Sequence, residues 1–442
     1  MPTILESSPA QELLAQALVE ADDLRLCTDR LTEFLGRYLP RLTRSEQRDH
    51  ATALLRGKLS DSQRKTTEPL AHQADQSRRP LQLFVGAGGW SDEALRVEMI
   101  QHVVEEIGDP QAVLVLDPSA FPKQGTQSCG VDRQWCGRLG KIDNCQVGVF
   151  LAYVSPHGKA LVDTRLYLTE ERAHDRAHRK KTHVPDEVAF QEKWRIGLDL
   201  LRERGPQLPH GWVVGDDELG RVIAFRSALR FMGERYVLDV PCDTLLRDPS
   251  NRPAPKRPGG RRGVPPWERV DAWSQRQPAD RWQRVRIREG TKGSLEAEVL
   301  SHWVQTKDEE GGPGPRERLT VIRSWGESPQ VWYTLSNARE SVVPVLAQVH
   351  GCRHGIEELF REGNEEIGLD HYEVRSWVGW SHHMTLSMLA LWFVQIERIR
   401  LGKKNTGDDG VASTSDLHGA VAASGVEHGA AGGKGERDPA SQ

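Results

Sequence analysis

The order of apolar runs and turns between residues 91 and 168 limits how this chain can fold more than any other feature. A helical stretch at about 92–107 leads into the apolar run 112–116, which ends at Asp117. Two more strand-like runs follow, at 147–154 and 160–168, and a Ser-Pro-His-Gly turn separates them. The sequence therefore predicts one helix followed by three successive strands.

Beyond these strands, helical and strand-like patterns alternate. The pattern predicts a helix at 186–204, a strand ending at Asp216, a helix at 218–232 and a strand at 236–240. Three strands followed by alternating helices and strands is the order of an RNase H-like α/β domain. In that fold the first and fourth strands are neighbours, so Asp117 and Asp216 are expected side by side.

Three carboxylates, far apart in the sequence, occupy positions that a metal-dependent nuclease would use. Asp117 and Asp216 each end a strand-like run, and Glu357 lies in a helical stretch. Such residues can converge on a pair of divalent ions, which suits phosphodiester chemistry. Mg²⁺ or Mn²⁺, which prefer oxygen ligands, fit an all-carboxylate site. The alternative is that these acids are ordinary capping residues at the ends of elements.

The residues around the three acids resemble one particular family. The blocks are 117–125 (DPSAFPKQG), 128–141 (SCGVDRQWCGRLGK), 144–149 (NCQVGV), 213–221 (VVGDDELGR), 356–360 (IEELF) and 368–377 (GLDHYEVRSW). They resemble the catalytic blocks of DDE transposases of bacterial insertion sequences, specifically the insertion-sequence 701 family, from about residue 30 to about residue 400.

This resemblance implies an activity, a cofactor and partners. It implies a transposase that cleaves and joins phosphodiester bonds at the ends of its element by a two-metal mechanism. Asp117, Asp216 and Glu357 would be both the catalytic residues and the ligands of two Mg²⁺ or Mn²⁺ ions. The partners implied are the element ends and target DNA, bound by a homo-oligomer of the chain.

Some positions depart from the family pattern. His350 and Asn364 replace the usual tyrosine and lysine of the glutamate region, and Pro118 and Ala120 are unusual beside the first aspartate. We expect Arg353 to share one helical face with Glu357 and Asn364 and to hold a DNA phosphate. The departures leave open a weakened or inactive transposase-derived DNA-binding protein, and a hydrolase of another phosphate ester is a third hypothesis. Asp217 and Glu358 are alternative ligands.

Basic residues gather in two places that suggest DNA binding. Lys123, Arg133, Arg138 and Lys141 flank the first aspartate, and alternation along a strand places Arg284, Arg286 and Arg288 on one face. Glu296 and Glu298 on a neighbouring strand could instead neutralise that face. The net charge of −4 does not itself argue for nucleic acid.

The sequence predicts five segments. They are an N-terminal helical domain with a probable DNA-binding role (1–85), the first part of the RNase H-like core (86–240), a β-rich insertion (241–336), C-terminal core helices carrying Glu357 (337–402) and a disordered tail (403–442). The first helices carry Arg44, Arg48, Arg56, Lys58, Arg64 and Lys65. These side chains form either a solvated face or a DNA-end-binding surface.

Composition and motifs narrow the cellular location of the protein and exclude some classes of protein. No apolar run approaches the ~20 residues of a membrane span, and no secretion signal is visible at the N-terminus. The six cysteines lack zinc-ribbon spacing and are expected as reduced thiols. No phosphate-binding P-loop motif occurs, which disfavours an ATPase. We expect a cytoplasmic protein that joins the nucleoid when bound to DNA.

Overall fold

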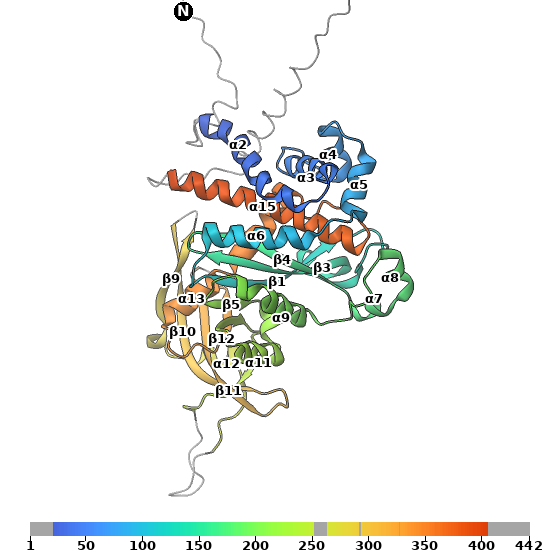
Figure 1. Ribbon diagram of the computed structural model, residues 1–442. Helices are drawn as coiled ribbons and strands as arrows, with labels where there is room; N and C mark the ends of the chain where they lie inside the picture. Colours follow the sequence, from blue (N-terminus) through green and yellow to red (C-terminus); the bar gives the residue numbers. More distant parts are fainter. Residues whose placement is uncertain (1–20, 252–262, 291–292, 327, 405–442) are drawn as a thin grey trace, which may run out of the picture. The chain divides into compact units, whose positions relative to one another are not determined.

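The computed structural model describes residues 21–251, 263–290, 293–326 and 328–404 (Figure 1). They form two compact units, one of residues 100–360 and one that joins the chain up to residue 99 with the chain from residue 361. The basic loop 252–262 and nearly all of the tail predicted at 403–442 lie outside the described residues. Within the described ranges, no helix is both long and apolar enough to cross a lipid bilayer. All six cysteines are free thiols, as predicted.

A ten-stranded mixed sheet forms the centre of the 100–360 unit. Its order is β2-β3-β1-β5-β6-β12-β11-β10-β9, and β4 pairs with β3. The strands are β1 (Val113–Pro122), β2 (Asp132–Cys136), β3 (Lys141–Ser155), β4 (Gly158–Tyr167), β5 (Trp212–Gly215), β6 (Tyr236–Asp239), β9 (Gln283–Gly290), β10 (Gly293–Lys307), β11 (Pro313–Ser324) and β12 (Val331–Ser336). A separate pair joins β7 (Leu245–Leu246) to β8 (Glu268–Arg269).

The strands that lead to the two aspartates are neighbours, as predicted. β1 pairs antiparallel with β3 and parallel with β5, and β5 pairs parallel with β6. Both β1 and β5 begin with four buried residues, the pattern of strands covered on both faces. The strand β2 was not predicted, and β3 begins six residues before the predicted 147.

The strands of the segment predicted as a β-rich insertion continue the same sheet. β12 pairs antiparallel with β6, which joins the insertion strands to the core strands. One face of the insertion packs on Val270 and Trp273 of α12 (Val270–Gln275), and the other packs on Ala347 of α13 (Val343–Gly351). The insertion is therefore an extension of the central sheet with an apolar core on each face.

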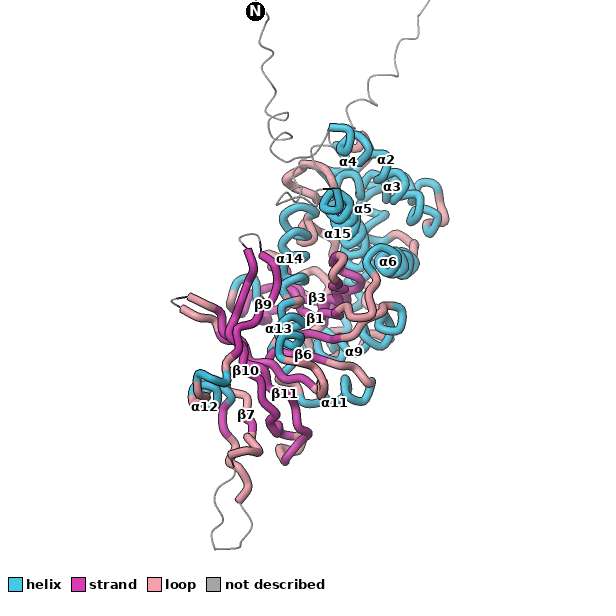
Figure 2. Tube along the Cα trace, turned by 90° about the vertical axis from the view of Figure 1, so that its left-hand side faces the viewer, coloured by secondary structure: helices cyan, strands magenta, loops and turns pink. Residues whose placement is uncertain are grey.

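Helices flank the sheet of this unit (Figure 2). They include α7 (Glu170–His174), α8 (Arg176–Thr182), α9 (Lys193–Arg204), α10 (Asp217–Gly220), α11 (Ile223–Met232) and α14 (His354–Glu362), whose last two residues are counted with the other unit. Two helices are shorter in the structure than the sequence predicts. The 186–204 helix begins only at Lys193, and the 218–232 helix breaks at Val222, whose extended backbone caps α11.

The other unit is helical. It contains α2 (Ala21–Tyr38), α3 (Ser45–Lys58), α4 (Thr67–Gln73), α5 (Arg78–Ala87), the first half of α6 (Asp92–Ile107), the π-helix Gly363–Ile367 and the long α15 (Trp377–Lys404). Arg30 of α2 forms a salt bridge with the fully buried Glu397 of α15, with a shortest N–O distance of 2.5 Å. The imidazole of His382 lies within hydrogen-bonding distance of the Val85 and Trp90 carbonyls. This salt bridge and the His382 contacts join the N-terminal helical segment to α15.

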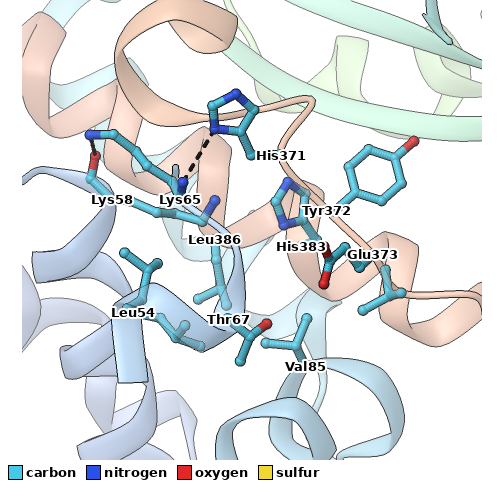
Figure 3. Close-up of a pocket in the computed structure, with 12 residues that line it drawn as sticks. Leu54, Lys58, Lys65, Thr67, Val85, His371, Tyr372, Glu373, His383 and Leu386 are labelled. Carbon is cyan, nitrogen blue, oxygen red and sulfur yellow. Dashed lines mark hydrogen bonds between the residues drawn. The ribbon is translucent and has the colours of Figure 1, made fainter. Parts of the chain in front are cut away.

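Two lysines assigned to a solvated or DNA-binding face are buried instead. Lys58 and Lys65 are only 3% and 5% exposed, and they line a cavity of about 20 Å³ together with His371 and His383 (Figure 3). The Lys65 ammonium donates to the carbonyls of Lys58 and Ser60. The Lys58 ammonium is buried and has no hydrogen-bond partner among the described residues. These two lysines are therefore unavailable to DNA, and that part of the prediction was wrong.

Stability of the helical unit is expected to rise with pH because of these lysines. Burial, and then the charge of Lys65, lower the pKa of Lys58 to about 7, and burial lowers the pKa of Lys65 to about 8. Between those values and the usual lysine pKa, the unfolded chain binds more protons, so the free energy of unfolding increases as pH rises from 7 to 10. We expect a slope of up to about 1.4 kcal/mol per pH unit for each lysine.

Chemical unfolding of the wild type and of Lys58→Met across this pH range measures the effect. The variant should show a shallower slope, whereas Arg56→Met, which replaces an exposed cation of the same helix, should not. An identical slope in the wild type and Lys58→Met would show that Lys58 keeps its proton in the folded state.

Candidate active site

Three aspartates follow one another across three adjacent strands, just beyond the last parallel pairs of β1, β5 and β6. The strand end predicted at Asp117 was wrong, because β1 stays paired with β3 as far as Pro122 and Asp117 lies within the strand. Leu116 of β1 pairs with Gly215, and Gly215 pairs with Leu238 of β6. The next residues along these strands are Asp117, Asp216 and Asp239. Neighbouring strands lie about 4.8 Å apart, so the backbones of the three aspartates follow one another across the sheet edge.

Asp117 is the most strongly perturbed of these acids. Its pKa is raised well above the usual value, first by burial and then by the negative charge of Asp216. Glu357 and Glu218 raise the pKa further, and the Arg353 guanidinium opposes them. The sequence-predicted acids are thus close enough to influence one another's ionisation, although 99 and 141 residues separate them (216 − 117 and 357 − 216).

Asp216 is at once a helix cap and a member of the acidic group. Its carboxylate accepts a hydrogen bond from the Leu219 amide at 3.1 Å and caps α10. Burial raises its pKa to about 6, against the opposing effect of the Leu219 amide and with a further contribution from Glu218. The capping alternative raised from the sequence is therefore correct, but it does not remove Asp216 from the site.

Glu357 reaches the group from the first turn of α14. Arg353 Nη2 lies 2.7 Å from Glu357 Oε1, and His354 Nδ1 lies 3.3 Å from Glu357 Oε2. Both carboxylate oxygens therefore have a nitrogen neighbour. The side chain remains 44% exposed, so it is the most accessible of the three predicted acids.

Arg353 is the cation at the centre of this acidic site. Its Nε lies 3.4 Å from Asp239 Oδ2, while its Nη2 is paired with Glu357. Burial would lower its pKa, but Asp239, Glu357, Asp117 and Asp216 together raise it. On the far side of Asp239, His350 Nε2 lies 3.0 Å from Oδ1. Asp239, 7% exposed, is thus held between Arg353 and His350.

The alternative ligands have other partners. Asp217 pairs with Arg221 at 3.1 Å, and Glu358 pairs with Lys159 and, at 3.1 Å, with His354. Neither acid is among the main charges that raise the pKa of Asp117. The geometry therefore favours Asp216 over Asp217 and Glu357 over Glu358.

The oxygen-only donor set suits a hard divalent ion. Burial raises the pKa values of Asp117 and Asp216, and nearby carboxylates raise them further, so a divalent cation would relieve that excess negative charge. Among the residues that the structure describes, no three His, Cys, Asp or Glu side chains are grouped closely enough to hold a metal ion. The carboxylates therefore fit such an ion by their chemistry and charge, but the part of the chain that the structure describes does not gather three of them around one point.

Of the three residues expected to share one helical face, Arg353 and Glu357 are in contact, but Asn364 does not lie on that face. The Arg353–Glu357 ion pair confirms the first part. Arg353, however, precedes α14, and Gly363–Ile367 is wound as a π-helix, so Asn364 does not continue the α-helical spacing. The wider turn of a π-helix shifts the residues that follow it to another face.

The residues predicted to bind DNA differ in how exposed their side chains are and in the pairings found for them. Arg284 pairs with Glu296 and lies over the ring of Trp325, which matches the neutralising alternative. Arg286 and Arg133 are exposed, Lys123 is half-buried, and Lys141 is exposed but lies 2.9 Å from Asp143. Arg288 lies further along β9, and its side chain falls outside the described residues.

Three contributors to the site were not predicted. Asp239 is the last residue of the observed β6, but the predicted strand 236–240 ends one residue later, so a search for aspartates at strand ends misses it. For His354, the sequence indicates only that it lies in a helical stretch, and not that it contacts Glu357. Lys193, which lies 2.7 Å from Glu218, belongs to a helix whose start was misplaced, and no sequence signal links the two residues.

Comparisons with known proteins agree with this geometry. The sequence profile of the family described as "DDE superfamily endonuclease" matches residues 37–294, more than half of the chain, including Asp117 and Asp216. The "Probable transposase for insertion sequence element IS701" of Microchaete diplosiphon is 30% identical over 94 residues. That match spans 21% of this chain and only 25% of the relative.

Two solved structures share a distant likeness. One is titled "Cryo-EM structure of piggyBac transposase synaptic complex with hairpin DNA", with 10% identity, a TM-score of 0.39 and coverage of 90% of this chain and 80% of that one. The other is the NurA nuclease from Sulfolobus solfataricus, with 10% identity, a TM-score of 0.26 and coverage of 59% and 80%. On the extent of the profile match, the chain belongs to the family of DDE superfamily endonucleases.

Proposed function

We propose that this protein is a DNA transposase that cleaves and joins phosphodiester bonds at the ends of an insertion sequence. The observation that carries the proposal is the placement of Asp117 and Asp216 on neighbouring strands, with Arg353, the partner of Glu357, beside them. Burial and the charges of Asp216 and Glu357 raise the pKa of Asp117. The strand order β4-β3-β1-β5-β6, with β5 and β6 parallel to β1, supports an RNase H-like core for it. The acting form would be a homo-oligomer on DNA.

Asp117, Asp216 and Glu357 would hold two Mg²⁺ or Mn²⁺ ions. Bound there, such ions lower the pKa of an attacking oxygen and stabilise the leaving oxygen. The chain's own residues supply the carboxylates and a cation. Arg353, half-buried beside the acids, would bind a DNA phosphate at the bond to be cut.

The test is cleavage of labelled duplexes that carry the DNA flanking the coding region. Cutting at the junction in Mg²⁺ or Mn²⁺, and none in EDTA, is the expected result. Binding of the duplex without cutting by the wild type would support the alternative, an inactive transposase-derived DNA-binding protein. One observation favours that alternative, because both Glu357 oxygens are already next to Arg353 and His354.

Replacing Asp239 is expected to weaken cleavage through Arg353. Asp239 holds the guanidinium at 3.4 Å, so Asp239→Asn should loosen Arg353 over the catalytic carboxylates. Residues that orient functional groups in this way typically contribute about 10- to 100-fold to activity. We expect a loss of kcat of that size, with DNA affinity little changed.

Two further variants separate this role from a general loss of structure. Asp217→Asn, an exposed acid in the same region, should leave the rate nearly unchanged. If Asp239 acts through Arg353, adding Asp239→Asn to Arg353→Gln should produce little further loss. Fully additive losses would assign Asp239 a role of its own.

Element-end binding is expected to depend on phosphate contacts and to weaken steeply with salt. Arg284, Arg286 and Arg288 lie along β9, and replacing all three with alanine should lower affinity and flatten the dependence of log Kd on log salt. Binding titrations at several salt concentrations measure the slope. An unchanged slope would mean that the glutamates of β10 already neutralise this face.

A further inference from the structure

An uncovered apolar patch lies on the ribbon formed by β2 and the start of β3. Trp135 and Ile142 face each other across the two strands and are 55% and 60% exposed. Leu139, in the turn between them, is 45% exposed. Large exposed apolar side chains gathered at one tip mark a contact surface more often than a chance exposure.

The Trp135 indole lacks the cover that other tryptophans of this chain have. Arginine side chains lie over the rings of Trp194, Trp212, Trp267, Trp282, Trp303 and Trp325. Within the described ranges, no aromatic ring or cation lies against Trp135, although two arginines are close to it in sequence. Its aromatic face is therefore open to an outside partner.

The ribbon that presents this patch is firmly anchored at its base. Asp132 accepts a hydrogen bond from the Thr169 hydroxyl at 2.5 Å, and Arg172 donates to the Val131 carbonyl at 2.8 Å. The Asn144 amide donates to the Gly125 carbonyl at 3.0 Å. Gly140 makes the turn with a φ of +63°, which glycine adopts without strain. A ribbon held in this way loses little entropy on binding.

The charges around the patch indicate which kind of partner would bind it. Arg133, Arg138 and Lys141 are exposed beside it. The ribbon strands carry only two acids, and each has a partner. Asp132 accepts a hydrogen bond from Thr169, and Asp143 pairs with Lys141. An open aromatic and aliphatic tip framed by cations fits nucleic acid, whose phosphates pair with the cations while its bases meet the apolar side chains.

Strand register places the patch at a defined distance from the acidic site. Asp117 pairs with Phe150 of β3, and Ile142 lies eight residues earlier on the same strand (150 − 142). At about 3.3 Å per residue this is about 26 Å, or about eight base pairs of B-form DNA. The main sheet ends before this point, because β1 pairs with β3 only as far as Cys145.

We propose that the Trp135–Ile142 tip is a wedge that enters a groove of duplex DNA and partly unstacks a base step about eight base pairs from the cut. Arg133 and Lys141 hold the flanking phosphates. The inference rests on the proposed function, because the position is counted from the acids assigned to cleavage. It adds a bending contact that the basic residues alone would not provide.

The experiment compares DNA binding by the full chain carrying Trp135→Ala with Ile142→Ala against the wild type, in EDTA. The probe is a duplex of one flanking end with 2-aminopurine placed at successive positions. Wild-type binding should raise the 2-aminopurine signal about eight base pairs from the junction. The double variant should lose that signal and bind about tenfold or more weakly, with an unchanged salt slope, because stacking and not charge is removed.

Two other variants keep the result interpretable. Phe231→Ala removes an aromatic side chain that is 95% exposed on α11 and should bind as the wild type does. Trp135→Phe keeps a stacking ring and should retain most of the 2-aminopurine signal.

Wild-type affinity in the double variant would overturn the proposal. So would a change in self-association of the DNA-free protein, which would make the ribbon a protein interface, and so would absence of any duplex binding by the wild type. Failure of the wild type to cut in Mg²⁺ or Mn²⁺ would count against the proposed function alone, because the binding and 2-aminopurine readouts need no cleavage.

Discussion

Asp117→Asn is expected to abolish cleavage, by about a thousandfold or more, while DNA binding is nearly unchanged. Asparagine keeps the shape of the side chain but loses the charge needed to hold a shared metal ion. Binding rests on basic residues elsewhere, so affinity should be retained or improve slightly as a negative charge leaves the site. The measurement is cleavage of labelled element ends together with a binding titration of the same duplex.

The same substitution is expected to raise the unfolding temperature of the metal-free protein. Burial and the charges of Asp216 and Glu357 oppose ionisation of Asp117, so a neutral side chain relieves a cost that the folded state bears. A functional site that is costly to stability in this way is common in enzymes. Thermal unfolding in EDTA measures the shift.

Asp217→Asn is the matched control, because it removes a nearby but exposed carboxylate that already has Arg221 as partner. It should shift the unfolding temperature little. A lower unfolding temperature for Asp117→Asn would show that the negative charge of Asp117 is stabilised in the resting protein, and a simple repulsion argument would then be wrong.

The strand order around the acids could be predicted because it depends on local patterns. The apolar runs before Asp117 and Asp216 predict β1 and β5, and the turn after residue 154 separates β3 from β4. One rule of the fold then places β1 beside β5. The same reasoning does not reach Asp239, because the apolar pattern continues to Val240 and predicts a strand that ends one residue too late.

Burial and pairing of charged side chains could not be predicted from local patterns. Lys58 ends α3 and Lys65 lies in the connection to α4, where the local sequence looks solvated. Only the packing of α3, α4 and α15 removes both lysines from water. Arg284 alternates with apolar residues as a DNA-binding strand would, but its partner Glu296 comes from another strand. These outcomes depend on tertiary contacts.

Glu317→Gln is expected to destabilise the 100–360 unit by about 3–5 kcal/mol. Glu317 of β11 is fully buried and lies 3.1 Å from both Arg226 and Arg230 of α11, and it also accepts hydrogen bonds from Tyr236 and Thr306. Removing its charge leaves Arg226, itself only 3% exposed, without its counter-ion. Chemical unfolding of the wild type and the variant measures the loss.

The exposed pair on the same insertion provides the control for this loss. Glu296→Gln breaks the pairing with Arg284, and because Arg284 is well exposed to solvent the cost should stay below about 1 kcal/mol. Equal losses of unfolding free energy in Glu317→Gln and Glu296→Gln would mean that burial does not increase the cost of breaking the Glu317 network.

The position of the Glu317 network ties the insertion to the acidic site. Tyr236 begins β6, and Asp239 ends the same strand beside Arg353 and His350. Because β12 continues the sheet directly from β6, we expect the insertion and the core strands to unfold in one transition. Hydrogen exchange of β5 and β10 should therefore accelerate together in Glu317→Gln, and cleavage should fall with it. Faster exchange in β10 alone, with cleavage intact, would instead make the insertion a separately folding module that the acidic site does not need.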